Sequence, residues 1–494
     1  MHEMMAAFFM ASLFACALQM QVLARPVQEM DWLSARDGWI VDSHGNKVIL
    51  RGANYNGMEF GWFEHTESDF ALMRSWGFDV VRFPIAWGYV EPVKGTYDST
   101  YLERLDKVVG WCKDNGLYVI IDMHQWNWAP KFGGNGLPDW AVEPYKDQDE
   151  AKVAFYTDEK VQQRFFDAWK YVAARYANEP AVVAYDVFNE ANANYDQMPR
   201  DEFVERLRTF YENAIDSIRE VDSRHMIMIE PPWGAEVEAL AKVERTNLVL
   251  STHLYTEGTS DGKTGYDGRR QTLESDFLRG YALAREWGVP LFVGEFGIGS
   301  AATLSREWAR DMLDIMDRYM VGSTWWAFWR DDKEFGLLDQ RGNEKREIVS
   351  VLERIYPKRF MIAPVNFSYD VELDRFEISW DLPLESEVGA TVSIPRSLRA
   401  NLSSASNLAG FEKYISSDAT EAVLSGNGSG ELWIILSPTN LDWLAKYLPW
   451  IREEVIKLGS ENSSLKVVLL ILGLFILGEN LIILKLRKPQ GKKK

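Results

Sequence analysis

The residues best suited to chemistry are two glutamates, each near the end of an apolar run. Glu190 closes the run at 182–190, and Glu295 lies in the run at 290–296. Two carboxyl groups can break a β-glycosidic bond, because one gives a proton to the departing oxygen while the other attacks the anomeric carbon. We therefore take Glu190 as a candidate acid/base and Glu295 as a candidate nucleophile. Retention of configuration requires the two groups to lie about 5–5.5 Å apart.

Other polar residues fit the same chemistry. Arg82 could keep the nucleophile ionised, and Asn189 could bind a sugar 2-hydroxyl. His253 and Tyr255 stand two residues apart, so on a strand both point the same way and could hydrogen-bond the two carboxylates. Glu190 has no expected cationic partner, so it should keep the raised pKa that an acid needs.

Eight β-branched, apolar runs alternate with helix-length segments and must position these residues. The runs span 48–55, 79–85, 118–124, 182–190, 226–231, 247–255, 290–296 and 323–329. Near-continuous apolar runs that alternate with helices are typical of a parallel sheet buried on both faces. Eight such units within about 310 residues predict an α/β fold of the (β/α)8 TIM-barrel type. The runner-up is a doubly wound open sheet, but no glycine-rich phosphate fingerprint follows the first run.

The position of the polar residues favours an active site at the C-terminal rim of that barrel. Most runs are apolar until their last two or three residues, which then become reactive. The residues in question are Arg82, His124, Asn189, Glu190, Glu230, His253, Tyr255, Glu295 and Trp329. Glu230 could take a catalytic role, although Pro231-Pro232 suggests a wall residue. Asp122 lies inside its run and is interpreted as a core carboxylate.

A metal centre is the weaker interpretation of the two histidines at the rim. His124 and His253 could be ligands, but barrel metallohydrolases gather several His and Asp, and the chain holds only six His. We expect neither a metal nor another cofactor.

The rim residues also carry a family resemblance. A similar ordered set is found in glycoside hydrolase family 5, the cellulase-like retaining enzymes; here it consists of Arg82, His124, Asn189-Glu190, His253-Leu254-Tyr255, Glu295 and Trp329. The resemblance covers residues 38–356. It implies that Glu190 is the acid/base, that Glu295 is the nucleophile, and that Trp329 is the platform under the sugar being cleaved.

Within that family, one loop resembles the endoglycoceramidase branch, whose members release oligosaccharides from glycolipids. It contains His124-Gln125 and the segment FGGNGLPDW at 132–140. Trp126 and Trp128 belong to the same loop and would add an apolar wall suited to a lipid aglycone. The resemblance implies a β-linked glycolipid as substrate. An endo-β-glucanase or mannanase acting on soluble polysaccharide remains open, as does a non-catalytic carbohydrate-binding surface protein.

Both ends of the chain read as membrane-directed segments. An apolar stretch at residues 4–23 and a small residue, Ala24, predict a signal peptide over 1–24, although its start holds no Lys or Arg. Residues 466–485 predict a transmembrane helix, and 486–494 form a basic tail that the positive-inside rule places in the cytoplasm. We expect a cell-surface protein with its catalytic domain outside.

Between these ends the sequence predicts three further parts. The catalytic barrel is expected over 28–357, a small antiparallel β-sandwich over 360–438, and a stalk helix over 439–465, with a coiled coil as the alternative for the stalk. Four sequons fall in the last two parts, at Asn366, Asn401, Asn427 and Asn462.

Composition and charge limit the partners. The 494 residues carry a formal net charge of −19, which argues against nucleic acid as a ligand. The predicted leader contributes −1 and residues 466–494 contribute +6, which leaves −24 on residues 25–465. Twenty Trp are many, and flat aromatic faces are suited to holding sugar rings as well as to filling a core. Cys112 would be the single cysteine left after cleavage, so no intrachain disulfide is expected.

Overall fold

Eight parallel strands close into a barrel in the computed structural model, which describes residues 30–399 and 402–438. They are β4 (Arg51–Asn54), β5 (Val80–Ile85), β6 (Tyr118–Met123), β7 (Val182–Asp186), β8 (Met226–Ile229), β9 (Leu248–Leu254), β10 (Leu291–Phe296) and β11 (Gly322–Trp325). The hydrogen-bonded order is β10-β11-β4-β5-β6-β7-β8-β9. Each strand falls within one of the eight predicted runs, except that β11 begins one residue before its run. The predicted barrel is confirmed, and the open sheet is excluded.

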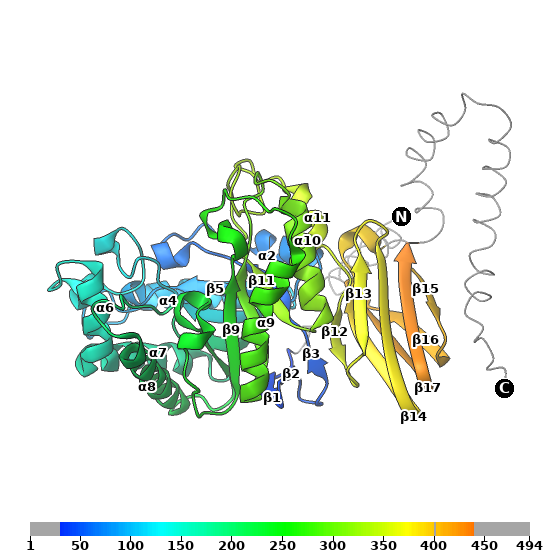
Figure 1. The fold of residues 1–494 in the computed structure, drawn as a ribbon, viewed down its shortest axis with the longest axis horizontal. Helices are drawn as coiled ribbons and strands as arrows, with labels where there is room; N and C mark the ends of the chain where they lie inside the picture. The colour runs from blue at the N-terminus through cyan, green and yellow to red at the C-terminus, as the bar shows by residue number, and fades with distance from the viewer. Residues whose placement is uncertain (1–29, 400–401, 439–494) are drawn as a thin grey trace, which may run out of the picture.

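Helices cover the outside of the barrel (Figure 1). They are α2 (Glu67–Ser75), α3 (Trp87–Val90), α4 (Ser99–Asp114), α5 (Asp139–Val142), α6 (Gln148–Thr157), α7 (Glu159–Tyr176), α8 (Arg200–Arg219), α9 (Arg270–Trp287), α10 (Ser305–Arg318) and α11 (Arg346–Leu352). Short 3-10 helices are η1 (Met58–Phe60), η2 (Pro130–Phe132), η3 (Pro232–Gly234), η4 (Val237–Ala239), η5 (Thr256–Asp261) and η6 (Arg396–Leu398). Local sequence signals explain these elements. In α4, the Asp98 side chain caps the N-terminus by accepting from the Thr100 and Tyr101 N–H groups, and one face buries its apolar residues in the core.

A nine-stranded antiparallel sheet lies beside the barrel (Figure 1). Its strands are β1 (Ser34–Arg36), β2 (Trp39–Val41), β3 (Lys47–Val48), β12 (Pro357–Phe360), β13 (Asn366–Asp370), β14 (Arg375–Ser393), β15 (Leu402–Ser406), β16 (Ala409–Ile415) and β17 (Glu421–Pro438). The antiparallel β-structure predicted for the C-terminal region is confirmed. The sequence did not predict that β1–β3 belong to this sheet. These short strands come before the barrel in the sequence, whereas β12 follows it.

The sheet and the barrel share buried contacts. Strand β3 pairs with β12, with Val48 opposite Arg359. Ile49, which follows β3, packs in the apolar core of the sheet with Tyr356. Barrel residue Arg74 forms an ion pair with Glu421 of β17 at 2.9 Å, so charged contacts accompany the apolar ones.

Several predicted segments lie outside the described residues: the signal peptide 1–24, the stalk helix 439–465, the transmembrane helix 466–485 and the basic tail 486–494. In the described part of the chain, no helix is both long and apolar enough to cross a membrane. Of the sequons, Asn366 and Asn427 are exposed on the sheet. The other two, Asn401 and Asn462, are outside the described residues.

Candidate active site

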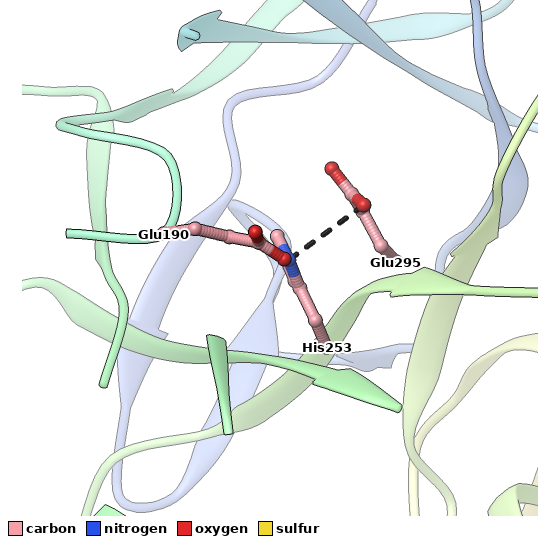
Figure 2. Close-up of side chains that lie close together, drawn as sticks. All are labelled: Glu190, His253 and Glu295. Atoms are coloured by element: carbon pink, nitrogen blue, oxygen red, sulfur yellow. Dashed lines mark hydrogen bonds and ion pairs between the residues drawn. The ribbon is translucent and has the colours of Figure 1, made fainter. Parts of the chain in front are cut away.

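Glu190, His253 and Glu295 converge at the mouth of the barrel, where the C-terminal ends of the strands meet (Figure 2). Ligand atoms of the three side chains all lie within 4.8 Å of one another, so the two carboxylates are within 4.8 Å at their nearest oxygens. His253 lies between them, with Nδ1 2.8 Å from Glu190 Oε1 and 3.7 Å from Glu295 Oε2. This separation suits attack by one carboxylate while the other transfers a proton.

Arg82 of β5 is a buried hub beneath the mouth. Its Nη1 donates to Glu295 Oε1 at 2.8 Å, and its Nη2 donates to Asn189 Oδ1 at 2.9 Å. Its Nε donates to Asp186 Oδ2 at 3.0 Å, and Nη2 also reaches Glu230 Oε1 at 3.0 Å. The guanidinium has a fixed fork of donors, so it holds these groups in one geometry.

Glu295 owes its direction to an irregularity in β10. The register with β9 shifts between Val293 and Glu295, and a bulge of this kind re-aims the side chain that follows it. A Cβ at Gly294 would meet Ser251 Oγ at 2.5 Å, so the strands approach closely only because this residue is glycine. Tyr255 O–H then donates to Glu295 Oε2 at 2.8 Å. Burial, together with the nearby carboxylates, raises the pKa of Tyr255 well above its usual value, which keeps it a neutral donor.

Glu190 is held through its backbone. Its φ of 45° is a left-handed conformation that non-glycine residues seldom adopt. The Glu190 N–H donates to Glu230 Oε2 at 2.7 Å, and its carbonyl accepts from Gln125 Nε2 at 3.1 Å and Asn192 Nδ2 at 2.8 Å. Strain of this kind persists where surrounding contacts fix the residue, and it is concentrated at functional sites.

The electrostatics differ in one respect from the sequence-based expectation. Burial by itself would lower the pKa of His253, because it disfavours the charged ring. The carboxylates of Glu230 and Glu295 outweigh this effect and raise the pKa well above its usual value. Glu190 therefore does have a cationic neighbour, contrary to prediction. The pKa of Glu190 is nevertheless raised, because the effect of burial exceeds that of the His253 hydrogen bond. Burial would also raise the pKa of Glu230, but His253 and Arg82 lower it to about 2.

His124 lies at the mouth, and the aromatic ring beside it is that of Trp326. The ring expected as the sugar platform, Trp329, lies elsewhere. The His124 and Trp326 rings stack with centroids 5.5 Å apart and an interplanar angle of 10°. Trp329, the predicted platform, instead stacks on Trp62 at 6.0 Å. Strand β11 ends at Trp325, so residue 326 leaves the strand at the mouth while residue 329 already belongs to the following loop. Asp122 fixes His124 by accepting from Nδ1 at 2.7 Å.

The predicted apolar wall is divided between surface and core. Trp126 is 53% exposed, as a wall residue would be. Trp128 is 1% exposed, and its ring packs edge-on against Phe155 and Phe188 in the core. The placement of Trp128 therefore differs from the prediction, because the loop turns inward at this residue and packs its ring into the core.

Sequence reasoning missed two residues that support the site, Asn54 and Asp186, and interpreted a third, Glu230, as a wall residue. Asn54 accepts from Arg82 Nη1 at 3.0 Å and donates to the Gly294 carbonyl at 2.9 Å. Asp186 binds the other side of the guanidinium, and Glu230 is buried beneath the mouth and does not form its wall. The same signal, a polar residue closing an apolar run, applies to Asn54 and Asp186 as well.

The family model described as Cellulase (glycosyl hydrolase family 5) matches residues 41–332, more than half of the chain and nearly all of the barrel. The chain belongs to glycosyl hydrolase family 5. This membership confirms the predicted enzyme class, a retaining glycoside hydrolase.

Curated relatives and solved structures resemble the chain over different shares of its length. Endoglucanase C of Acetivibrio thermocellus is 23% identical over 58% of this chain and 91% of that protein. An endoglycoceramidase of Cyanea nozakii is 23% identical over 68% of this chain and 77% of that protein. The solved structure of endo-glycoceramidase II from Rhodococcus sp. covers 81% of this chain and 99% of that chain, with a TM-score of 0.68 and 23% identity. An endogalactoceramidase structure covers 83% of this chain and 100% of that chain, with a TM-score of 0.66 and 26% identity.

By distance alone, the donor atoms of Glu190, His253 and Glu295 could also hold a cation. Hydrogen bonds already account for the arrangement of these side chains. His253 bonds to Glu190, and Glu295 accepts from both Arg82 and Tyr255. Two carboxyl groups in such an arrangement can also act as acid and nucleophile in glycoside hydrolysis.

Proposed function

We propose that this family 5 enzyme cleaves the bond between a β-linked glycan and a lipid, with an endo-β-glucanase as the second candidate. The observation that carries the reaction type is the pair of carboxylates within 4.8 Å at the barrel mouth. Glu295 attacks the anomeric carbon, and the C–O bond to the leaving group breaks as Glu190 passes its proton to that oxygen. A water molecule then enters, gives a proton to Glu190, and attacks the glycosyl-Glu295 ester.

The surrounding residues assist both steps in this mechanism. Arg82 and Tyr255 each bind one oxygen of Glu295, which orients the nucleophile. The Asn189 amide nitrogen donates to the Gln125 carbonyl at 3.0 Å and has a longer contact of 3.5 Å with His124 Nε2, which a sugar 2-hydroxyl would replace. Trp326, beside His124, is the ring we assign as the platform under the sugar being cleaved.

Two observations support a glycolipid substrate. The structural likeness to proteins named for ceramide glycolipids extends over barrel and sheet together, whereas the endoglucanase match covers 58% of the chain. A pocket of about 400 Å³ opens beside Glu190, where the leaving group must begin, and Trp233, Ala235, Val237 and Leu254 give it an apolar part. The exposed Trp62, stacked on the partly buried Trp329, favours the second candidate, since such faces also bind glucan chains.

The test uses the full-length chain in detergent. The Glu295→Gln variant is the blank. Glu103→Gln is the matched control, because Glu103 lies on the exposed face of α4. Each protein is incubated separately with a β-linked glycolipid, β-glucan and β-mannan, and the released sugars are identified by mass. Intact oligosaccharide released from the glycolipid supports the proposal. Shortened glucan or mannan with untouched glycolipid would reject it in favour of a polysaccharide hydrolase.

We also propose that the enzyme is held at the cell surface by 466–485, with the catalytic domain outside. The net charge of −24 on residues 25–465 opposes binding of that part to anionic lipid, so the tail would supply the attachment. Full-length protein should be membrane-bound and cleaved by protease on intact cells, and a chain ending at 465 should appear in the medium. A full-length protein protected from protease until the cells are lysed would contradict this arrangement.

A further inference from the structure

Trp233, in the loop after β8, carries several unusual features at once. Its φ is 55°, a left-handed conformation that is a genuine outlier for a bulky residue. Its side chain is 47% exposed although it is large and apolar. It lines the same pocket as Glu190. We propose that Trp233 is the residue against which the first part of the leaving group packs, and that it thereby sets aglycone specificity; this rests on the proposed function.

The loop holds Trp233 in a fixed position relative to the acid. The Trp233 N–H donates to the carbonyl of Ala191, the residue after Glu190, at 3.1 Å. At the start of the loop, Glu230 accepts from the Glu190 N–H at 2.7 Å. One backbone hydrogen bond thus joins the loop to the residue after the acid, and the side chain of Glu230 binds the backbone of the acid itself, so the acid and the exposed indole are placed as one unit.

The next residue makes this position possible. Gly234 has a φ of 67°, and a Cβ there would lie 2.5 Å from Cγ of His253. Only glycine allows the loop to lie directly on the imidazole that contacts Glu190. The loop is therefore built around the catalytic residues, and Trp233 projects from it.

The indole is supported by a cation. Lys152 of α6 places its Nζ 5.4 Å from the Trp233 ring centroid, a cation–π contact. Lys152 is itself buried, and its Nζ lies 3.6 Å from Asp149. The lysine contacts the ring and holds it in place, while the exposed part of the ring lines the pocket.

The pocket indicates the kind of group that would pack there. It measures about 400 Å³, and Ala235 and Val237 lie beside Trp233 while Thr256 and Ser260 supply hydroxyls. In the proposed mechanism Glu190 protonates the glycosidic oxygen. The first atoms of the leaving group, on the far side of that oxygen from the anomeric carbon, therefore enter this pocket. An aromatic face with apolar neighbours fits C–H groups, which occur both at the head of a lipid alcohol and on the face of a pyranose.

The experiment separates substrates that have an aglycone from one that has none. Trp233→Asn removes the ring but keeps a residue that tolerates the left-handed backbone, and Trp233→Phe keeps a ring. The substrates are a β-linked glycolipid, a cello-oligosaccharide and a 2-deoxy-2-fluoro-β-glycosyl fluoride. The glycosyl fluoride forms the Glu295 ester with loss of fluoride, and the mass of the intact protein reveals the ester. Because fluoride is a single atom, this substrate has no aglycone to occupy the pocket.

We expect Trp233→Asn to lower kcat/KM about 10- to 100-fold on whichever aglycone substrate the wild type cleaves. The rate of labelling by the fluoride should stay within about twofold of wild type, and Trp233→Phe should recover most of the loss. Tyr414→Asn, which removes an exposed ring from the sheet, should match wild type in every assay.

Three outcomes would overturn the inference. An equal loss with the fluoride would mean that Trp233 acts on the catalytic residues and not on the aglycone. No loss on a cleaved substrate would mean that nothing packs against the ring, and an equal loss in the Phe variant would mean that the ring is not the binding element. Failure of the wild type on glycolipid with success on the oligosaccharide would reject the glycolipid proposal alone, since Trp233 would still be tested on the oligosaccharide.

Discussion

At the scale of single residues, the chemistry depends on two glutamates with different surroundings. Glu295 is bound through both oxygens by Arg82 and Tyr255, whereas Glu190 has one side-chain partner, His253. Burial raises the pKa of Glu190 so that it can hold a proton where an exposed glutamate would be ionised. One carboxyl is thus positioned to attack and the other to donate.

Replacement of the nucleophile should abolish turnover without unfolding the protein. We expect Glu295→Gln to lower kcat by at least about 10³-fold, because the amide cannot form the covalent ester. The rate is measured on the substrate identified above, and the Tm is measured alongside it. A stable Glu295→Gln variant with near wild-type turnover would remove Glu295 from the mechanism.

Replacement of the acid should depend on the leaving group and on pH. Glu190→Gln should slow a poor leaving group about 10²- to 10⁴-fold but hardly affect formation of the glycosyl-enzyme from a dinitrophenyl glycoside. In the wild type, kcat/KM should fall as pH rises through the raised pKa of Glu190, since the proton is then lost. Burst kinetics across pH check both points. If the variant kept the same alkaline fall, another group would be the acid.

At the scale of elements, the close approach of β9 and β10 positions the nucleophile. A Cβ at Gly294 would lie 2.5 Å from Ser251 Oγ, and the shift in register next to it turns Glu295 into the mouth. Ser251 Oγ is buried and has no hydrogen-bond partner among the described residues. The serine hydroxyl can therefore be removed at little cost, which allows a direct test.

Gly294→Ala should destabilise the protein by about 1–3 kcal/mol and reduce kcat, because the strands must separate where Glu295 is aimed. Ser251→Ala alone should be nearly neutral, and adding it to Gly294→Ala should recover part of both losses. Thermal unfolding and initial rates of the four proteins complete a double-mutant cycle. Strict additivity of the two changes would exclude the contact as the cause.

At the scale of the whole molecule, barrel and sheet form one unit. A cavity of about 830 Å³ lies at their junction, and its charged lining is largely paired. Glu421 of β17 binds Lys358 and Arg74 there. Burial would raise the pKa of Glu421, but Lys358 and Arg74 together lower it below its usual range. Such a carboxylate stabilises the fold above the usual Glu pKa, and this contribution is lost as the pH falls below it.

Glu421→Gln should therefore destabilise the protein by about 3 kcal/mol at pH 7, because two buried cations lose their carboxylate. The difference in Tm from wild type should shrink as the pH falls below the usual Glu pKa, because the unfolded wild-type chain then takes up a proton that the folded carboxylate, with its lowered pKa, does not. Activity at low temperature should be unchanged, since the site is at the opposite end of the barrel strands. A Tm difference that does not vary with pH would show that charge is not the cause.

The sequence by itself determined the barrel and most of the candidate catalytic groups. Apolar runs that end in polar residues predict parallel strands whose C-terminal ends meet, and this rule applies to Asn189, Glu190, His253 and Glu295 alike. Such patterns are local, so they can be read without knowing what lies across the barrel.

The tertiary structure decided what depends on partners far apart in the chain. The raised pKa of Glu190 beside His253, the stacking of Trp326 on His124, and the burial of Trp128 follow from packing between segments far apart in the chain. The exposed ring of Trp233 beside the acid, and the pairing of β3 with β12, follow in the same way. These features rest on distances between segments, and periodicity along a sequence carries no information about such distances.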